Sequence, residues 1–291
     1  MQFLVAVRST TYSARTLQIG SSLAAGFSAD LSIVYVGDRP KELLAEGVNL
    51  SRDTMLNWEI YHPGVEVLRW AYEKMQEFGM VDPESGEFDP TNLVEDAGRI
   101  RVLVPQLHGE KIRLILREGD PVDQLKQETE FRDYILTVVG GGSRKRLTRQ
   151  LVQFVDTSLL FVKNYDPDRD YRLLLCVDDS GATRRAVSFA ARVARYLKAH
   201  IRVVTVSKTK LFGPGYQGAA RWAQRYLDKA GADYSHEYAT GDPVSTFTAM
   251  AGEDHIIIMG KSRKSPLVKF LTSSKPAKTV LKANAPVILV K

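Results

Sequence analysis

Leu31-Ser32-Ile33-Val34-Tyr35-Val36 decides the fold, because the same pattern returns 170 positions later as Ile201-Arg202-Val203-Val204-Thr205-Val206. Three further pairs follow in the same order: Leu4-Val5-Ala6-Val7 with Leu174-Leu175-Cys176-Val177, Gly119-Asp120-Pro121-Val122 with Gly241-Asp242-Pro243-Val244, and Ser143-Arg144-Lys145 with Ser262-Arg263-Lys264. Four matches in one order predict two copies of one structural unit.

The second copy alternates short apolar runs with helical patterns. The predicted strands fall at 172–177, 201–206, 234–239, 255–259 and 286–290. The helical patterns fall at 182–199, 217–230, 246–251 and in a basic stretch that runs to residue 283. This alternation predicts an α/β fold, with an open, mostly parallel sheet and helices on both faces. Asp179 or Ser180 is predicted to cap the first helix, and Asp242 to cap the third with Pro243 at its first position.

The first copy follows the same plan but carries an insertion. We predict a first domain at 1–163 with an inserted segment at about 40–105, a linker at 164–170 and a second domain at 171–291. The insertion holds a helical pattern at 65–78, and the runs at 101–104 and 112–116 are predicted to pair as a hairpin. Residues 40–98 contain 13 acidic and 4 basic side chains, whereas the whole chain has a formal charge of +6.

Several classes of site find no support in the composition. The single cysteine, Cys176, excludes an internal disulfide framework and suits a reducing compartment, so we expect a cytoplasmic protein. The five histidines show no metal-ligand spacing, and no metal site is predicted. No catalytic triad can be identified from the sequence.

The ligand site of such a sheet lies beyond the C-terminal ends of its strands, where the strand order reverses. In the second copy Asp178 ends the first strand and Gly260 ends the fourth, so we expect both at one crevice. Gly260 lets the backbone approach a ligand closely, and the helix start that follows offers N–H groups to an anion. Lys261, Arg263 and Lys264 add positive charge there. Asp178 is equally suited to bracing the next helix.

The strand-Asp-x-Ser start at Val177-Asp178-Asp179-Ser180, the Gly-Asp-Pro turn and the glycine after the fourth strand resemble the universal stress protein family. The tandem form of that family fits the whole chain apart from the insertion. The resemblance implies two five-stranded sheets of order 3-2-1-4-5, packed about a pseudo-twofold axis. Nucleotide-binding members carry Gly-x2-Gly-x9-Gly-Ser/Thr after the fourth strand, and here these positions hold Gly260, Arg263, Ser273 and Ser274.

The resemblance implies a stress-response regulatory protein whose second domain binds an adenine nucleotide such as ATP. The residues it assigns to that site are Asp178, Ser180, Val206, Gly260, Arg263, Ser273 and Ser274. Arg263 either fills the phosphate pocket or grips a phosphate, and Ser274 suits a helix cap as well as a ligand contact. In the first copy Arg8 replaces the strand-end aspartate, so no nucleotide is expected there. At most, slow ATP hydrolysis is implied.

Two other functions stay open at this stage. One is a protein-interaction module that binds no nucleotide and acts through its acidic insertion and its dimer surfaces, as a homo-oligomer or with a basic partner. The other, less favoured, is nucleic-acid binding, for which no recognised motif is present. The basic side chains around Arg144-Lys145-Arg146 and after Gly260 otherwise suit solvated helix faces. A co-purified adenine nucleotide, detected by mass spectrometry, would favour the first function.

Overall fold

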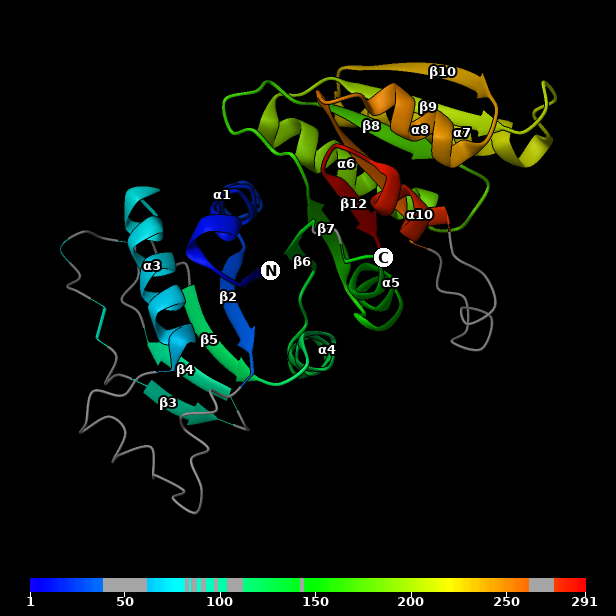
Figure 1. The fold of residues 1–291 in the computed structure, drawn as a ribbon. Helices are drawn as coiled ribbons and strands as arrows, with labels where there is room; N and C mark the ends of the chain where they lie inside the picture. Colours follow the sequence, from blue (N-terminus) through cyan, green and yellow to red (C-terminus); the bar gives the residue numbers. More distant parts are fainter. Residues whose placement is uncertain are drawn as a thin grey trace. The chain divides into compact units, whose positions relative to one another are not determined.

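The structure, a computed structural model, describes residues 1–38, 62–81, 84, 88–89, 93–96, 99–103, 112–141, 144–261 and 275–291. The chain divides into two compact units, Met1–Tyr134 and Ile135–Lys291. In each unit, helices pack against strands that are mostly parallel (Figure 1). The predicted α/β class is therefore confirmed, whereas the division into repeats at 1–163 and 171–291 stays a prediction.

The first unit is a sheet whose parallel part is extended by antiparallel strands. Its described elements are β1 (Gln2–Val7), α1 (Thr10–Gly26), β2 (Asp30–Gly37), α3 (Pro63–Glu77), β3 (Leu93–Asp96), β4 (Arg99–Leu103), β5 (Ile112–Glu118) and α4 (Pro121–Phe131). The strands lie in the order β1-β2-β5-β4-β3. β1, β2 and β5 are parallel, whereas β4 pairs antiparallel with β5 and β3 with β4. The predicted hairpin and the predicted helix in the insertion are both confirmed.

A buried ionic cluster ties the inserted strand β4 to the rest of the first unit. Glu128 of α4 accepts from Arg99 Nη1 at 3.0 and 3.2 Å, from Arg117 Nε at 2.8 Å and from the Tyr134 hydroxyl at 2.9 Å. The Arg99 guanidinium lies 3.4 Å from the centroid of the Phe131 ring. Burial and the neighbouring Glu128 raise the pKa of Tyr134. Because removing one partner of a buried ion pair costs about 3–5 kcal/mol, this cluster fixes β4, β5 and α4 together.

The second unit contains β6 (Leu136–Gly140), α5 (Lys145–Phe154), β7 (Ser158–Val162), β8 (Arg172–Val177), α6 (Thr183–Leu197), β9 (Ile201–Ser207), α7 (Pro214–Ala230), β10 (Tyr234–Thr240), α8 (Pro243–Ala251), β11 (His255–Gly260), α10 (Lys275–Lys282) and β12 (Val287–Val290). The strands of the second copy lie in the order β10-β9-β8-β11-β12 and are parallel. This is the order 3-2-1-4-5 predicted for this copy. The prediction of a separate five-stranded sheet is wrong, because β7 continues the sheet beyond β12. Helices α6 and α7 pack together, as do α8 and α10 (Figure 1).

β7 and β12, the last strands of the two copies, are neighbours in the second unit. They pair antiparallel, with Phe161 opposite Val287 and Leu159 opposite Leu289. Helices α5 and α10, which precede these strands, also contact each other. Antiparallel pairing of equivalent strands is the relation produced by a local twofold axis. Within the second unit, the α5–β7 and α10–β12 segments are therefore two related halves.

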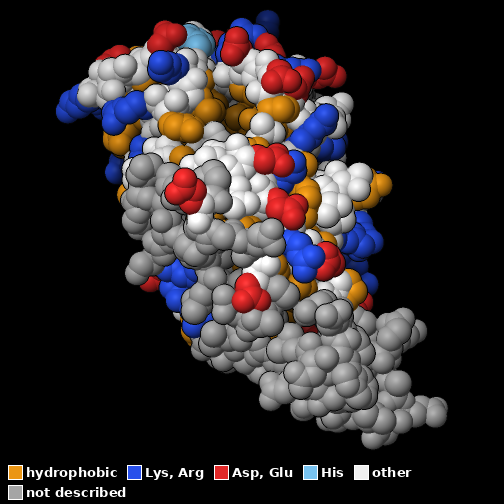
Figure 2. Space-filling view, turned by 90° about the vertical axis from the view of Figure 1, so that its left-hand side faces the viewer, with side chains coloured by type: hydrophobic (Ala, Val, Ile, Leu, Met, Phe, Trp, Pro, Cys, Tyr) orange, Lys and Arg blue, Asp and Glu red, His pale blue; other side chains and the backbone are white. Residues whose placement is uncertain are grey.

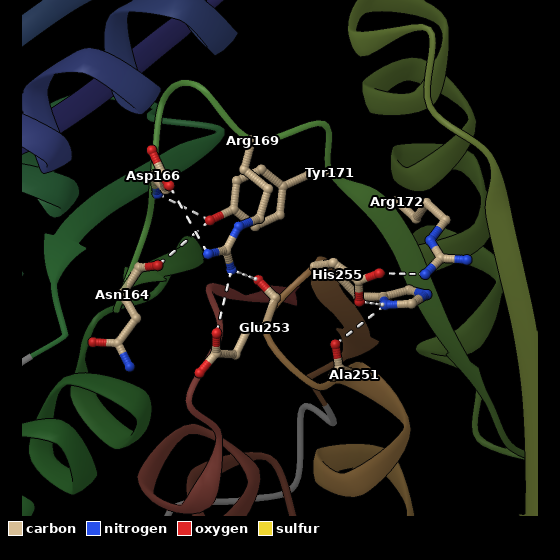
Figure 3. A network of polar contacts seen from close by, with 9 residues as sticks. Asn164, Asp166, Arg169, Tyr171, Arg172, Ala251, Glu253 and His255 are labelled. Carbon is tan, nitrogen blue, oxygen red and sulfur yellow. Dashed lines mark hydrogen bonds and ion pairs between the residues drawn. The ribbon is translucent and has the colours of Figure 1, made fainter.

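The linker between the copies is held to the turn between α8 and β11 (Figure 3). The Tyr171 ring stacks on Tyr165 with centroids 5.3 Å apart, and its hydroxyl accepts from Asp166 N at 2.9 Å. Arg169 donates to the carbonyl oxygen of Glu253 at 2.5 Å, and Arg172 pairs with Asp254. The polar linker is thus a fixed connection in this structure.

The repeated Gly-Asp-Pro turn begins a helix in each copy. Asp120 Oδ1 accepts from Val122 N at 2.8 Å at the start of α4, and Asp242 Oδ1 accepts from Ser245 N at 2.9 Å at the start of α8. The glycines that precede them have φ of 124° and 149°, a conformation that a side chain disfavours. The predicted cap at Asp242 is confirmed. Across the described ranges, no helix combines the length and the apolarity that a membrane crossing requires.

Candidate functional site

The ends of β8, β9 and β11 meet at one edge of the second-unit sheet. The register places Met259 opposite Cys176, and Thr205 opposite Val177. Gly260 and Val206 therefore come one residue further along, beside the end of β8 where Asp178 begins the turn. Val206 is buried, whereas Asp178, Ser180 and Gly260 are partly exposed. The structure thus brings these four predicted site residues to a common edge.

The Asp178 carboxylate organises the turn between β8 and α6 through one of its two oxygens. Oδ1 accepts from Ser180 N at 3.0 Å and from Ser180 Oγ at 2.6 Å, and Thr183 Oγ1 lies 2.8 Å from it. Thr183 Oγ1 also accepts from Asp178 N at 3.2 Å. Within the described residues, Oδ2 accepts no hydrogen bond. A carboxylate oriented in this way presents one fixed acceptor to a ligand.

The prediction that Asp179 or Ser180 caps α6 is wrong. The N-cap position is Ala182, and no side chain accepts a hydrogen bond from the first turn of the helix. The hydrogen bonds run instead onto Asp178, because the chain between β8 and α6 folds back over the strand end before the helix begins. Asp178 therefore has the bracing role that the sequence left open, and its second oxygen is left for a further role.

In the equivalent turn of the first copy, a hydroxyl five residues after the strand end again accepts from the strand-end N–H, an arrangement that we call the brace. The strand-end residue itself is different. Ser13 Oγ accepts from Arg8 N at 2.9 Å and from Ser9 N at 3.2 Å, and Ser9 Oγ accepts from Tyr12 N at 3.3 Å. Arg8 itself is exposed. Its guanidinium has five N–H donors and no acceptor, so it cannot replace the Asp178 carboxylate.

Gly260 has a packing role in addition to any role toward a ligand. A Cβ atom at this position would lie 2.6 Å from Ala182 Cβ and 2.7 Å from Ala182 C. The start of α6 therefore rests directly on the end of β11, and only glycine leaves room for it. This contact fixes the spacing between the Asp178 turn and the backbone that continues toward residue 261.

Lys261 does not add positive charge to this edge, which corrects the prediction. Its side chain is buried, and Nζ donates to the carbonyl oxygen of Val155 at 2.7 Å. Val155 is the C-cap of α5, where helix carbonyl groups lack partners within the helix. Lys261 thus serves packing between the two halves of the second unit.

Sequence reasoning missed Tyr216, which lies near the Asp178 turn. Burial raises the pKa of the Tyr216 hydroxyl, with further contributions from the charges of Asp179 and Asp178. A Cβ atom on the adjacent Gly215 would lie 3.1 Å from Asp179 Cβ, so the start of α7 borders this turn. The position of Tyr216 depends on the loop between β9 and α7, and the sequence of that loop has no periodic pattern that would predict its path.

The other predicted site residues, Arg263, Ser273 and Ser274, lie outside the described residues. Among the described residues, no group of acidic, histidine and cysteine side chains could hold a metal ion. Cys176 is buried, and burial raises the pKa of its thiol. On the face drawn in Figure 2, basic and acidic side chains are interspersed, unlike the concentrated positive surface that nucleic-acid binding uses.

A family model matches the second copy. Residues 171–291 match the model of the universal stress protein family. No curated protein sequence matches the chain.

Solved structures resemble the chain over its full length. A universal stress protein from Archaeoglobus fulgidus is 15% identical, with a TM-score of 0.61 over 100% of this chain and 96% of that chain. A protein from Pseudomonas aeruginosa, described as a putative universal stress protein, is 15% identical, with a TM-score of 0.60 over 100% and 92%. A universal stress protein from Archaeoglobus fulgidus in complex with dAMP is 24% identical over 42% of this chain and 98% of that chain, with a TM-score of 0.33. The first two likenesses show that the fold extends over both copies.

Proposed function

We propose that residues 171–291, which match the model of the universal stress protein family, bind an adenine nucleotide at the edge formed by β8, β9 and β11. The first copy holds no nucleotide and has a structural or partner-facing role. The protein acts as a regulatory sensor in a stress response, and turnover of the nucleotide is not its task.

The proposal rests on the Asp178 carboxylate, because its two oxygens differ in their hydrogen bonding. Two Ser180 donors hold Oδ1, and the Thr183 hydroxyl lies 2.8 Å from both Oδ1 and the Asp178 carbonyl oxygen, so the side chain is already oriented. No described residue donates to Oδ2. The hydroxyl and amino groups of a nucleoside are suitable donors for such an oxygen. Because the orientation is fixed before binding, little entropy is lost when the ligand arrives.

The phosphates would extend from this edge toward the residues that follow Gly260. Lys261 is engaged with Val155, so it does not contribute to this part of the site. We assign phosphate recognition to Arg263, Ser273 and Ser274, which keep the spacing of the family motif. Arg263 would contact a phosphate with its guanidinium, and Arg263→Gly should then weaken ATP binding about ten-fold or more.

Asp178→Asn tests the proposal without dismantling the turn. The asparagine keeps an acceptor at Oδ1 but places an NH2 donor where Oδ2 stood. We expect ATP affinity, measured by titration calorimetry, to fall about ten-fold or more, because a hydrogen bond to a charged acceptor is replaced by two opposed donors. The control is Asp120→Asn, which makes the same chemical change at the N-cap of α4 in the other unit and should leave ATP affinity unchanged.

An unchanged ATP affinity in Asp178→Asn would contradict the proposal. So would an equal loss in both variants, because it would reflect general destabilisation. If the wild-type protein binds no adenine nucleotide at all, an interaction module acting through the acidic insertion becomes the better account.

A further inference from the structure

A cavity of about 260 Å³ lies in the second unit and shares no residue with the Asp178 edge. Its walls include the apolar side chains of Phe161, Val280 and Val287. Two lysines, Lys145 at the start of α5 and Lys163 after β7, and the buried Thr148 provide the polar part. Lys145 lines this cavity and is itself exposed, as expected for a solvated helix face.

The two related halves of the second unit differ at this place. The sheet register pairs Gly140 with Val162 in one half and Gly260 with Val290 in the other. Lys163 and Lys291 therefore follow equivalent strand ends. The same register makes Asp156 equivalent to Asn284, and Gly141 equivalent to Lys261. The helix ends agree, because Val155 N donates to Leu151 O and Ala283 N donates to Thr279 O.

Lys291 and Lys261, which belong to the α10–β12 half, have partners at the end of α5. Lys291 Nζ lies 2.7 Å from the carbonyl oxygen of Asp156 and 2.5 Å from its carboxylate, and Lys261 Nζ donates to the carbonyl oxygen of Val155. The positive charges there are compensated by an acidic side chain and by the carbonyl groups at the end of α5.

Lys163, in the α5–β7 half, lacks the equivalent acidic partner, and the second lysine is absent from this half. Asn284 stands where the Asp156 carboxylate would be, and Gly141, which has no side chain, replaces the lysine. Within the described residues, neither Lys145 nor Lys163 donates a hydrogen bond or forms an ion pair. Lys163 thus lines a cavity without an ionic partner among the described residues, whereas its counterpart Lys291 has an anionic neighbour.

We propose that this cavity binds a small carboxylate with a compact apolar body. The carboxylate pairs with Lys163 from within the cavity, as the Asp156 carboxylate pairs with Lys291, and Lys145 adds a second cation. The apolar walls bury the body of the ligand, which gains free energy in proportion to the area removed from water. Pockets for drug-sized ligands measure about 300–1,000 Å³, so this cavity suits a smaller molecule. The inference is independent of nucleotide binding.

Titration calorimetry of the full chain with octanoate tests the proposal. We expect saturable binding of octanoate, and no measurable binding of octanamide, which lacks the charge, or of inorganic phosphate, which lacks the apolar body. Lys163→Met should weaken octanoate binding about ten-fold or more, because it removes a charge-assisted contact. Lys291→Met, the matched control in the other half, should leave octanoate affinity unchanged.

Asn284→Asp is the sharper variant, because it installs the carboxylate that the cavity lacks. The new side chain should pair with Lys163 and weaken octanoate binding about ten-fold. Asn284 is exposed and Lys163 is partly exposed, so both variants should fold, and thermal unfolding checks this. The proposal is overturned if the wild-type protein does not bind octanoate, if octanamide or phosphate binds equally well, or if both variants bind octanoate as the wild type does.

Discussion

The turns after β1 and after β8 share one brace and carry opposite charges at the strand end. In each, a hydroxyl five residues further along accepts from the strand-end N–H: Ser13 from Arg8 at 2.9 Å, and Thr183 from Asp178 at 3.2 Å. The strand-end side chain is a cation in the first turn and a braced carboxylate in the second. The brace therefore belongs to the fold, whereas the strand-end residue can change its chemistry without altering the turn.

The largest effect on stability is expected for Gly260→Ala, which tests the contact beneath the second turn. The added Cβ would meet Ala182 at 2.6 Å, and two of the atoms it approaches are backbone atoms that cannot rotate away. Overpacking of this kind costs about 1–3 kcal/mol. Gly181→Ala is the control, because a Cβ there meets nothing within 4 Å and should change the unfolding free energy by about 0.5 kcal/mol or less. Equal stability of the two variants in denaturant unfolding would show that α6 does not rest on β11.

Removing the hydroxyl brace should destabilise both turns to a similar extent. Thr183→Val and Ser13→Ala each leave strand-end donors without an acceptor, at a cost of about 1–3 kcal/mol. Only Thr183→Val should also weaken ATP binding, since Thr183 helps to orient the Asp178 carboxylate. Chemical denaturation and ATP titration of both variants would measure this. Loss of ATP affinity in Ser13→Ala would contradict the assignment of the site to the second copy.

The Gly-Asp-Pro caps offer a comparison in which the copies should behave alike. Asp120→Ala and Asp242→Ala each remove an N-cap acceptor, and each should lower the unfolding free energy to a similar extent. The measurement is again denaturant unfolding of the full chain. If only one variant loses stability, the two turns differ in a way that their hydrogen bonds do not reveal.

The smallest effect is expected for Arg8→Asp, which gives the first turn the strand-end residue of the second. Because Arg8 is exposed, the unfolding free energy should change by about 0.5 kcal/mol or less. The variant should gain no nucleotide binding, because an aspartate at the strand end does not supply the phosphate contacts that we assign to Arg263, Ser273 and Ser274. A second ATP site appearing in calorimetry would mean that the strand-end residue alone decides binding.

Local features of this fold could be predicted from the sequence, and long-range partners could not. The strands of the second copy and the Asp242 cap follow from apolar runs and from turn chemistry, which act over a few residues. The hydrogen-bond partner of Lys261 could not be predicted, because Val155 lies 106 positions away in the sequence. The Arg99–Glu128 pair was missed for the same reason, and it forms only once β4 joins the sheet.

In the turn that holds Asp178, even hydrogen bonds between residues close in sequence could not be predicted. Asp178 was identified from its position at the strand end, but the direction of its hydrogen bonds was not, because α6 begins only at Thr183. Ser180 and Thr183 consequently donate toward the strand instead of accepting from the helix. The direction of these hydrogen bonds depends on the path of the four residues between Asp178 and Thr183, and residue preferences for turns do not determine that path.

Equilibrium dialysis with radiolabelled ATP tests the central claim most directly, because it counts the sites. If the second copy alone binds nucleotide through Asp178, the wild-type chain should bind one ATP at saturation. The Asp178→Asn variant should retain no more than weak binding at the same concentrations. Two ATP molecules per chain, or one site of unchanged affinity in Asp178→Asn, would contradict the account.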